Sequence, residues 1–134
     1  MYKKIILLFI CLIIVGIGTM SAQICFTATA NVYSNENNQK IGRQYIAANI
    51  TNNRVGTMTL GNLTLKAIIT NTKRDNVYNM TAYSVTLYSQ SAQTVDAVMT
   101  IRDNETCTVL VYYRDGTLRY DFSLRNNIQD GYHE

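Results

Sequence analysis

An alternation of apolar and polar residues runs through most of this chain and argues against a helical fold. In several segments between residues 26 and 124, apolar side chains recur at every second position, with many Thr and Asn residues between them. No stretch keeps the helical period. Alternation of this kind is typical of a β-strand with one buried and one exposed face. The pattern therefore predicts an all-β chain.

The alternating segments are separated by short polar turns, which predicts antiparallel strands joined by hairpins. We expect an antiparallel sandwich or a small barrel of about 7–8 strands, ending in a three-strand meander. The strands are predicted over residues 26–32, 42–51, 55–60, 63–69, 77–89, 94–102, 106–114 and 117–125.

The alternation changes phase at two places, and each allows two explanations. After Leu60, either Gly61-Asn62 is a two-residue hairpin turn or the strand carries a β-bulge; a Gly-Asn pair between alternating segments favours the hairpin. Within residues 77–89 the phase changes near Ala82 and Tyr83. A bulge at that point, or burial on both faces, would explain the second change.

The register of the last three strands can be derived from their turns. Asp115-Gly116 is typical of a two-residue hairpin turn, and a three-residue loop over residues 103–105 keeps the preceding hairpin in phase. Both turns place apolar residues opposite apolar residues, which specifies a core face. The predicted pairs are Tyr113/Leu118, Val111/Tyr120, Val109/Phe122, Cys107/Leu124, Ile101/Cys107, Met99/Val109 and Ala97/Val111.

The first 22 residues have the order of a secretory signal peptide. Lys3 and Lys4 precede an apolar run over residues 5–17, and small or mildly polar residues follow up to Ala22. The run is shorter than the roughly 20 residues that span a bilayer. The segment resembles export signals of Bacteroidota, which often end in Ser-Ala-Gln. An uncleaved N-terminal anchor is the alternative.

Three segments follow from this assignment: a signal peptide at residues 1–22, a single antiparallel β domain at residues 23–125 and a polar C-terminal tail at residues 126–134. We expect cleavage after Ala22 and a bacterial protein exported to the periplasm or the extracellular space. No stable membrane anchor is expected after cleavage. Cys11, inside the apolar run, and Cys25, just after the expected cleavage site, are each preceded by isoleucine and not by the small residue that lipidation needs, which argues against a lipid anchor.

Two cysteines remain after cleavage, Cys25 and Cys107. An even pair in an exported domain predicts a disulfide between them. It would tie the new N-terminus to the body of the fold. Two buried free thiols are the alternative.

Charge and histidine content argue against several classes of function. Loss of Lys3 and Lys4 leaves ten Lys and Arg against nine Asp and Glu, a net charge of +1, whereas nucleic-acid binding requires a basic surface. The one histidine, His133, is the penultimate residue. Histidine-based metal clusters, Ser/His/Asp triads and Cys/His pairs need a histidine inside the fold. We therefore expect no enzyme, metal or cofactor.

The outer face of the predicted meander is the candidate binding surface. In the derived register Tyr112 lies between Asp96 and Arg119, beside the apolar Val98 and Leu110. An exposed aromatic residue flanked by arginine and aliphatic residues has the composition of an interface hot spot. The alternatives are an ordinary outer face with a few strand-forming residues, or a face covered by another part of the chain.

The function expected from these features is that of an exported, non-catalytic binding module with a protein or glycan partner. The chain has ten tyrosines, nine of them after the expected cleavage, and they supply amphipathic contact surface at a low cost in side-chain entropy. A periplasmic immunity or inhibitor protein is one version. The alternative is a small lipocalin-like carrier of an apolar ligand, which requires a cavity lined by Met58, Met80, Met99 and tyrosines.

Overall fold

The structure is a computed structural model that describes residues 23–51 and 53–124. The expected signal peptide at residues 1–22 and the expected tail at residues 126–134 lie outside the described residues. The described part is all-β, as the alternation predicted.

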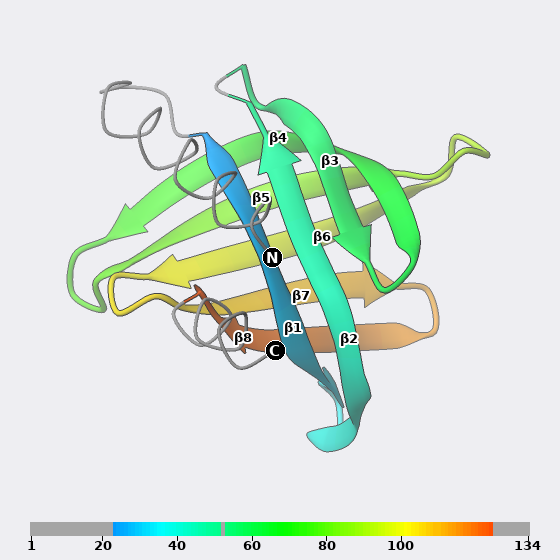
Figure 1. Cartoon of the computed structure of the whole chain (residues 1–134), viewed down its shortest axis with the longest axis horizontal. Coiled ribbons are helices and arrows are strands. Elements are labelled where there is room, and N and C mark those ends of the chain that lie inside the picture. Colours follow the sequence, from blue (N-terminus) through cyan, green and yellow to red (C-terminus); the bar gives the residue numbers. More distant parts are fainter. Residues whose placement is uncertain (1–22, 52, 125–134) are drawn as a thin grey trace, which may run out of the picture.

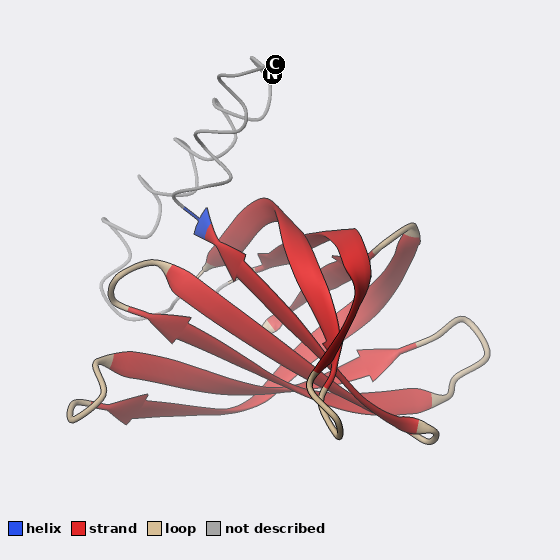
Figure 2. Cartoon of the chain, turned by 90° about the horizontal axis from the view of Figure 1, so that it is seen from below, coloured by secondary structure: helices blue, strands red, loops and turns tan. Residues whose placement is uncertain are grey.

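Eight antiparallel strands form a closed barrel, which decides between the two expected architectures (Figures 1 and 2). Each strand pairs with its neighbours in the sequence, and β8 returns to pair with β1. The last three strands form the predicted meander. The strands are β1 (Ile24–Ser34), β2 (Gln39–Ile50), β3 (Val55–Leu60), β4 (Leu63–Asp75), β5 (Met80–Tyr88), β6 (Thr94–Arg102), β7 (Thr106–Tyr113) and β8 (Gly116–Ser123).

The barrel interior is filled by side chains from all eight strands. Alternate residues of each strand point inward, and the buried inward residues are aliphatic, aromatic, Met or Cys. Several of these side chains have no accessible surface: Ala30, Ile46, Ile50, Met58, Ala67, Met99, Val109 and Val111. A cavity that holds water or a ligand would leave accessible surface on the side chains that line it. The interior around these eight residues is therefore solid.

The phase change after Leu60 is a hairpin, as favoured from the sequence. Leu60 pairs with Leu63, and Gly61 adopts a positive φ of 68° in the two-residue turn between them. The second phase change has another cause. The β5–β6 register is continuous, so no bulge occurs at Ala82. Residues 77–79 belong to a turn, and the β4–β5 register shifts within β4, near residue 70.

The β6–β7 register is confirmed. Ile101 pairs with Cys107 and Met99 with Val109 across the three-residue loop. Glu105 closes this loop with a φ of 73°, in the left-handed region that such loops commonly use.

The predicted β7–β8 register is wrong by two residues. Tyr113 pairs with Gly116, so the turn is Arg114-Asp115 and Gly116, with a φ of 145°, begins β8. A shift of two residues leaves every apolar side chain on the inner face, and apolar pairing therefore does not distinguish the two registers. The observed inner pairs are Val111/Leu118, Val109/Tyr120 and Cys107/Phe122.

The expected disulfide between Cys25 and Cys107 is not formed. Cys107 is a buried free cysteine on the inner face of β7. Cys25 lies between the buried Ile24 and Phe26, so its side chain points to the outer face of β1. The two side chains are thus on opposite sides of the barrel wall, which explains why the prediction fails.

Candidate functional site

The junction between β1 and β8, here called the seam, has two unequal halves. In its closed half, residues 31–34 of β1 pair with residues 118–121 of β8. In its open half, residues 24–30 of β1 keep their pairing with β2, but the β1–β8 ladder does not continue beside Phe122 and Ser123. The two strands diverge there, and a groove follows their divergence.

This seam groove has a volume of about 500 Å³. That size lies within the roughly 300–1,000 Å³ range of small-molecule sites. Most of its lining residues are polar, although polar and apolar atoms contribute similar shares of its surface. Residues from five strands or their ends contribute to it: Thr29, Asn31, Arg43, Arg102, Thr106, Cys107, Thr108, Asp121, Phe122 and Ser123.

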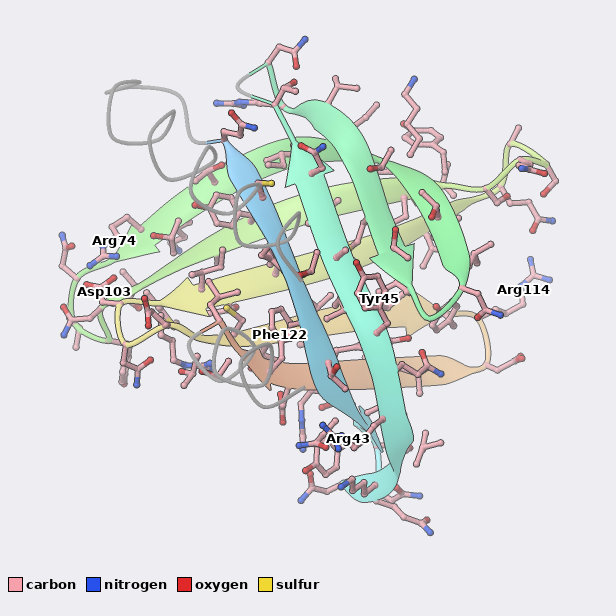
Figure 3. All side chains as sticks on the ribbon, viewed as in Figure 1. Arg43, Tyr45, Arg74, Asp103, Arg114 and Phe122 are labelled. Atoms are coloured by element: carbon pink, nitrogen blue, oxygen red, sulfur yellow. The ribbon has the colours of Figure 1, made fainter. Side chains whose placement is uncertain are left out.

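The two inward-facing residues of the lining, Phe122 and Cys107, form the base of the groove. Phe122 lies against β1 (Figure 3), and its ring centroid is 5.1 Å from that of Phe26. Burial raises the pKa of the Cys107 thiol to about 12, although the nearby Arg102 lowers it and Glu105 raises it further. The thiol is therefore protonated at neutral pH and a poor nucleophile.

Two arginines line the groove from opposite sides of the seam. Arg43 extends from β2 (Figure 3) and makes no ion pair with any described residue. Arg102, at the end of β6, donates a hydrogen bond from Nη1 to Thr108 Oγ1 over 3.3 Å. Asp121 is the one carboxylate among the lining residues.

Asp121 is neutralised by a residue outside the lining. Arg119 Nε lies 3.1 Å from Asp121 Oδ2, and Thr108 Oγ1 donates to Asp121 Oδ1 over 3.2 Å. Arg119 also donates to Asn38 Oδ1 over 2.7 Å, and its guanidinium lies 4.5 Å from the ring centroid of Tyr33. Arg119 thus contacts Asn38 and Tyr33 outside the groove and, at the same time, the carboxylate of Asp121 in the groove lining.

The five residues proposed from the sequence share the outer face of β6–β8, in an order that differs from the derived one. Asp96 faces Tyr112, as predicted, but Tyr112 faces Thr117 and not Arg119. The three remaining residues form one row, Val98–Leu110–Arg119. Tyr112 is 44% exposed, whereas this row is partly buried. Their role in binding stays a prediction.

The sequence did not indicate the β1 and β2 part of the groove. Arg102, Thr106 and Thr108 belong to the outer face already considered, but Thr29 and Arg43 lie far away in the sequence. The pairing of the first strand with the last brings them together. An even number of alternating strands joined by short hairpins is the only signal that could have raised that possibility.

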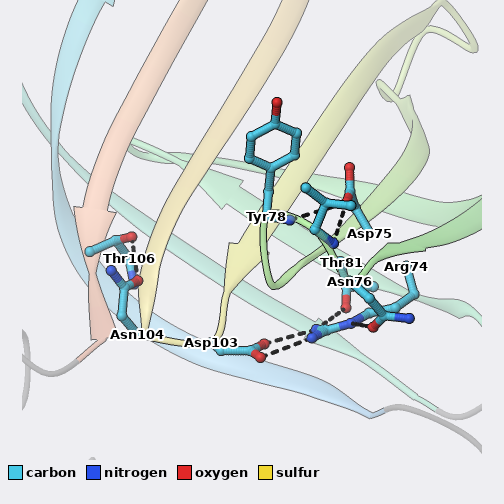
Figure 4. Close-up of polar contacts among 9 residues, drawn as sticks. Arg74, Asp75, Asn76, Tyr78, Thr81, Asp103, Asn104 and Thr106 are labelled. Carbon is cyan, nitrogen blue, oxygen red and sulfur yellow. Dashed lines mark hydrogen bonds and ion pairs between the residues drawn. The ribbon is translucent and has the colours of Figure 1, made fainter.

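A second exposed feature is the β4–β5 turn (Figure 4). Arg74 donates two hydrogen bonds to Asp103, of 2.8 and 2.9 Å, and holds the pKa of that carboxyl below its usual value. Asp75 Oδ1 accepts the backbone N–H groups of Val77 and Tyr78. These contacts fix a turn whose two apolar side chains are 82% and 71% exposed. Nothing in the structure shows what contacts them.

The described residues include no group of three or more His, Cys, Asp or Glu arranged to hold a metal ion. The part of the chain that the structure describes contains no helix that is long and apolar enough to cross a membrane. Comparisons with family models, curated proteins and solved structures find no match to this chain.

Proposed function

We propose that the protein is an exported, non-catalytic binding module and that it binds its ligand in the seam groove. The observation that carries this proposal is a polar groove of about 500 Å³ on a barrel whose interior is filled. Ligand sites are concave and carry a few convergent polar groups, and the seam groove has both properties.

The filled interior favours a surface site over the lipocalin-like carrier. A carrier of an apolar ligand needs a cavity among inward-facing residues, and Met58 and Met99 have no accessible surface. The hydroxyl, amide and guanidinium groups of the groove suit a hydrophilic ligand instead.

The chemistry of the lining supports a binding role rather than catalysis. Asp121 has no second lining carboxylate as an acid–base partner, and its oxygens are engaged by Arg119 and Thr108. The thiol of Cys107 is held protonated by burial. Neither group is prepared to act as a nucleophile or a general base.

Export is supported by the basic, apolar and small-residue order of residues 1–22. The periplasm and the extracellular space both fit this order. A protein partner, such as the target of an immunity or inhibitor protein, is the second candidate, and it would use the exposed Tyr112 with Asp96 rather than the groove.

Affinity capture with a matched pair of variants tests the proposal. Thr29→Trp fills the groove, whereas Thr72→Trp alters another exposed threonine, on β4, half-way around the barrel from the seam. Purified wild type and both variants are immobilised and exposed to soluble glycans and proteins of the producing cell. We expect a species retained by wild type and by Thr72→Trp but lost from Thr29→Trp. No retained species, or equal retention by all three, would contradict the proposal.

A further inference from the structure

The charged groups of the seam groove identify the ligand that it suits, if the proposed function holds. Two arginines line it, and neither is paired with a carboxylate of the described residues. Arg43 is exposed, and Arg102 is bonded to the hydroxyl of Thr108. Both guanidinium groups therefore keep donors for an anion, and arginine suits the planar geometry of a carboxylate.

The one carboxylate of the groove does not cancel this charge. One oxygen of Asp121 is paired with Arg119 and the other accepts from Thr108. Arg119 is in turn held by Asn38 and Tyr33, outside the groove. The charge of Asp121 is thus balanced from the closed half of the seam, and the two lining arginines remain in excess.

The neutral part of the lining resembles the surface that sugar hydroxyls require. Thr29 and Asn31 on the β1 side make no side-chain hydrogen bond to any residue that the structure describes. Thr106, Thr108 and Ser123 stand on the β7–β8 side. Hydroxyl and amide groups both donate and accept, as the hydroxyls of a sugar do. Phe122 and Cys107 supply apolar surface at the base of the groove.

We propose that the seam groove binds an acidic saccharide, with its carboxylate between Arg43 and Arg102 and its hydroxyls against the threonine and asparagine side chains. Arg119 acts as a positioning residue, because it holds Asp121 and neutralises its charge. A free phosphate would use the arginines but leave most of the polar lining without a partner. An acidic peptide would lack the hydroxyl groups that match this lining.

Isothermal titration calorimetry with two matched probes tests the ligand class. The probes are the trisaccharide of galacturonic acid and the trisaccharide of galactose, which differ in the carboxylate. We expect wild type to bind the acidic probe at least tenfold more tightly. Arg43→Gln and Arg102→Gln should each weaken acidic binding about tenfold or more, because each removes a charge-assisted hydrogen bond. Lys73→Gln, an exposed cation on β4, should change nothing.

A double-mutant cycle tests the part assigned to Arg119. Arg119→Gln should weaken acidic binding severalfold, because it leaves the charge of Asp121 facing the anion. Adding Asp121→Asn to this variant should restore the affinity for the acidic trisaccharide. The affinity for the galactose trisaccharide should be the same in the wild type, the single variant and the double variant. The unfolding midpoints of all variants are measured alongside. Because Arg43 is exposed, Arg43→Gln is the variant least expected to destabilise the fold.

Three results would overturn the proposal: equal affinity for both trisaccharides, no effect of Arg43→Gln and Arg102→Gln, or tighter binding of tetra-aspartate or inorganic phosphate than of the acidic trisaccharide. The failure of this ligand assignment can be distinguished from the failure of the proposed function. If Thr29→Trp abolishes capture of another ligand while galacturonate does not bind, the binding module stands and the ligand class is wrong. If Arg119→Gln alone has no effect, only its positioning role is wrong.

Discussion

The two halves of the seam close the same barrel by different means. In the closed half, the backbone ladder between β1 and β8 is reinforced by the β1–β2 loop: Asn35 N–H donates to Thr117 O, and Thr117 N–H donates to Glu36 Oε2, both over 2.9 Å. In the open half, the rings of Phe26 and Phe122 meet across the seam beyond the last ladder pair. One half is held by backbone and loop, the other by side chains.

This difference shows how a small barrel with a solid interior gains a concave surface. A complete β1–β8 ladder would leave the polar outer residues on a convex wall. Because the ladder ends at Asn31 and Asp121, the outer side chains beyond that pair surround a hollow. The closed half carries the backbone pairing, and the open half carries the groove proposed as the binding site.

The largest expected effect separates the two halves by stability. Tyr120 is buried and has a strand partner on each side, Val109 and Val32, whereas the β1 ladder does not reach the buried Phe122. We expect Tyr120→Ala to lower the free energy of unfolding by about 4–5 kcal/mol and Phe122→Ala by about 3 kcal/mol. The loss is smaller for Phe122→Ala because the unpaired strands of the open half can move into the cavity that the missing ring leaves. Urea denaturation measures both. A larger loss for Phe122→Ala would contradict the comparison.

The reactivity of the Cys107 thiol should show how far the seam excludes solvent and reagents from the barrel interior. It is 2% exposed, and burial raises its pKa to about 12. At pH 8 we expect iodoacetamide to modify Cys107 about a thousandfold more slowly in the folded than in the unfolded protein, because thiolate is the reactive form. Peptide mass spectrometry follows this residue alone. In Arg119→Gln, Cys107 should be modified faster, since the substitution removes contacts in the closed half. Rapid modification of Cys107 in the folded wild type would show that reagent reaches the thiol through the seam.

A smaller effect concerns Glu36 and acid pH. The backbone N–H of Thr117 lowers the pKa of Glu36 from its ordinary value of 4.5. A lowered folded-state pKa contributes stability above the unfolded value, and that contribution is lost as pH falls through the folded value. We expect wild type to melt above Glu36→Gln at pH 7 and the two melting temperatures to converge below pH 4. A constant difference across this range would mean that the ionised carboxylate does not hold the loop.

The smallest expected effect lies on the face first proposed from the sequence. Tyr112 is 44% exposed, so Tyr112→Ala should change the free energy of unfolding by within about 0.5 kcal/mol. Binding of the galacturonic acid trisaccharide should also be unchanged. Loss of a captured protein partner in this variant would instead favour the surface around Tyr112 as an interface. A large loss of stability would mean that Tyr112 contributes to packing.

Local patterns predicted all eight strands, because alternation and turn chemistry act over a few residues, but β4 continues to Asp75 where the sequence pattern ended at Ile69. They gave the hairpin at Gly61-Asn62 and the β6–β7 register with Glu105 in its loop. The β7–β8 register failed because a shift of two residues keeps the same face buried, and the contacts that accompany the observed register, between Thr117 and the β1–β2 loop, lie far apart in sequence.

The candidate site was predictable only in part, for the same reason. Its β6–β8 side lies on the outer face that the alternation identified, but its other side comes from β1 and β2. Nothing local marks Thr29 or Arg43 as a neighbour of Ser123. The expected disulfide failed because cysteine parity alone ignores which face of the wall each residue occupies: Cys107 is inward and Cys25 outward.

Mapping of amide chemical shifts in the ¹⁵N-labelled protein, during titration with the galacturonic acid trisaccharide, tests the central claim most directly. The account predicts shifts concentrated in the groove, at Thr29, Asn31, Thr106, Thr108 and Ser123, with little change on the far wall at Thr72. Shifts centred on Asp96, Tyr112 and Thr117, or shifts among the inward-facing residues of the barrel, would contradict the assignment of the open half of the seam as the binding site.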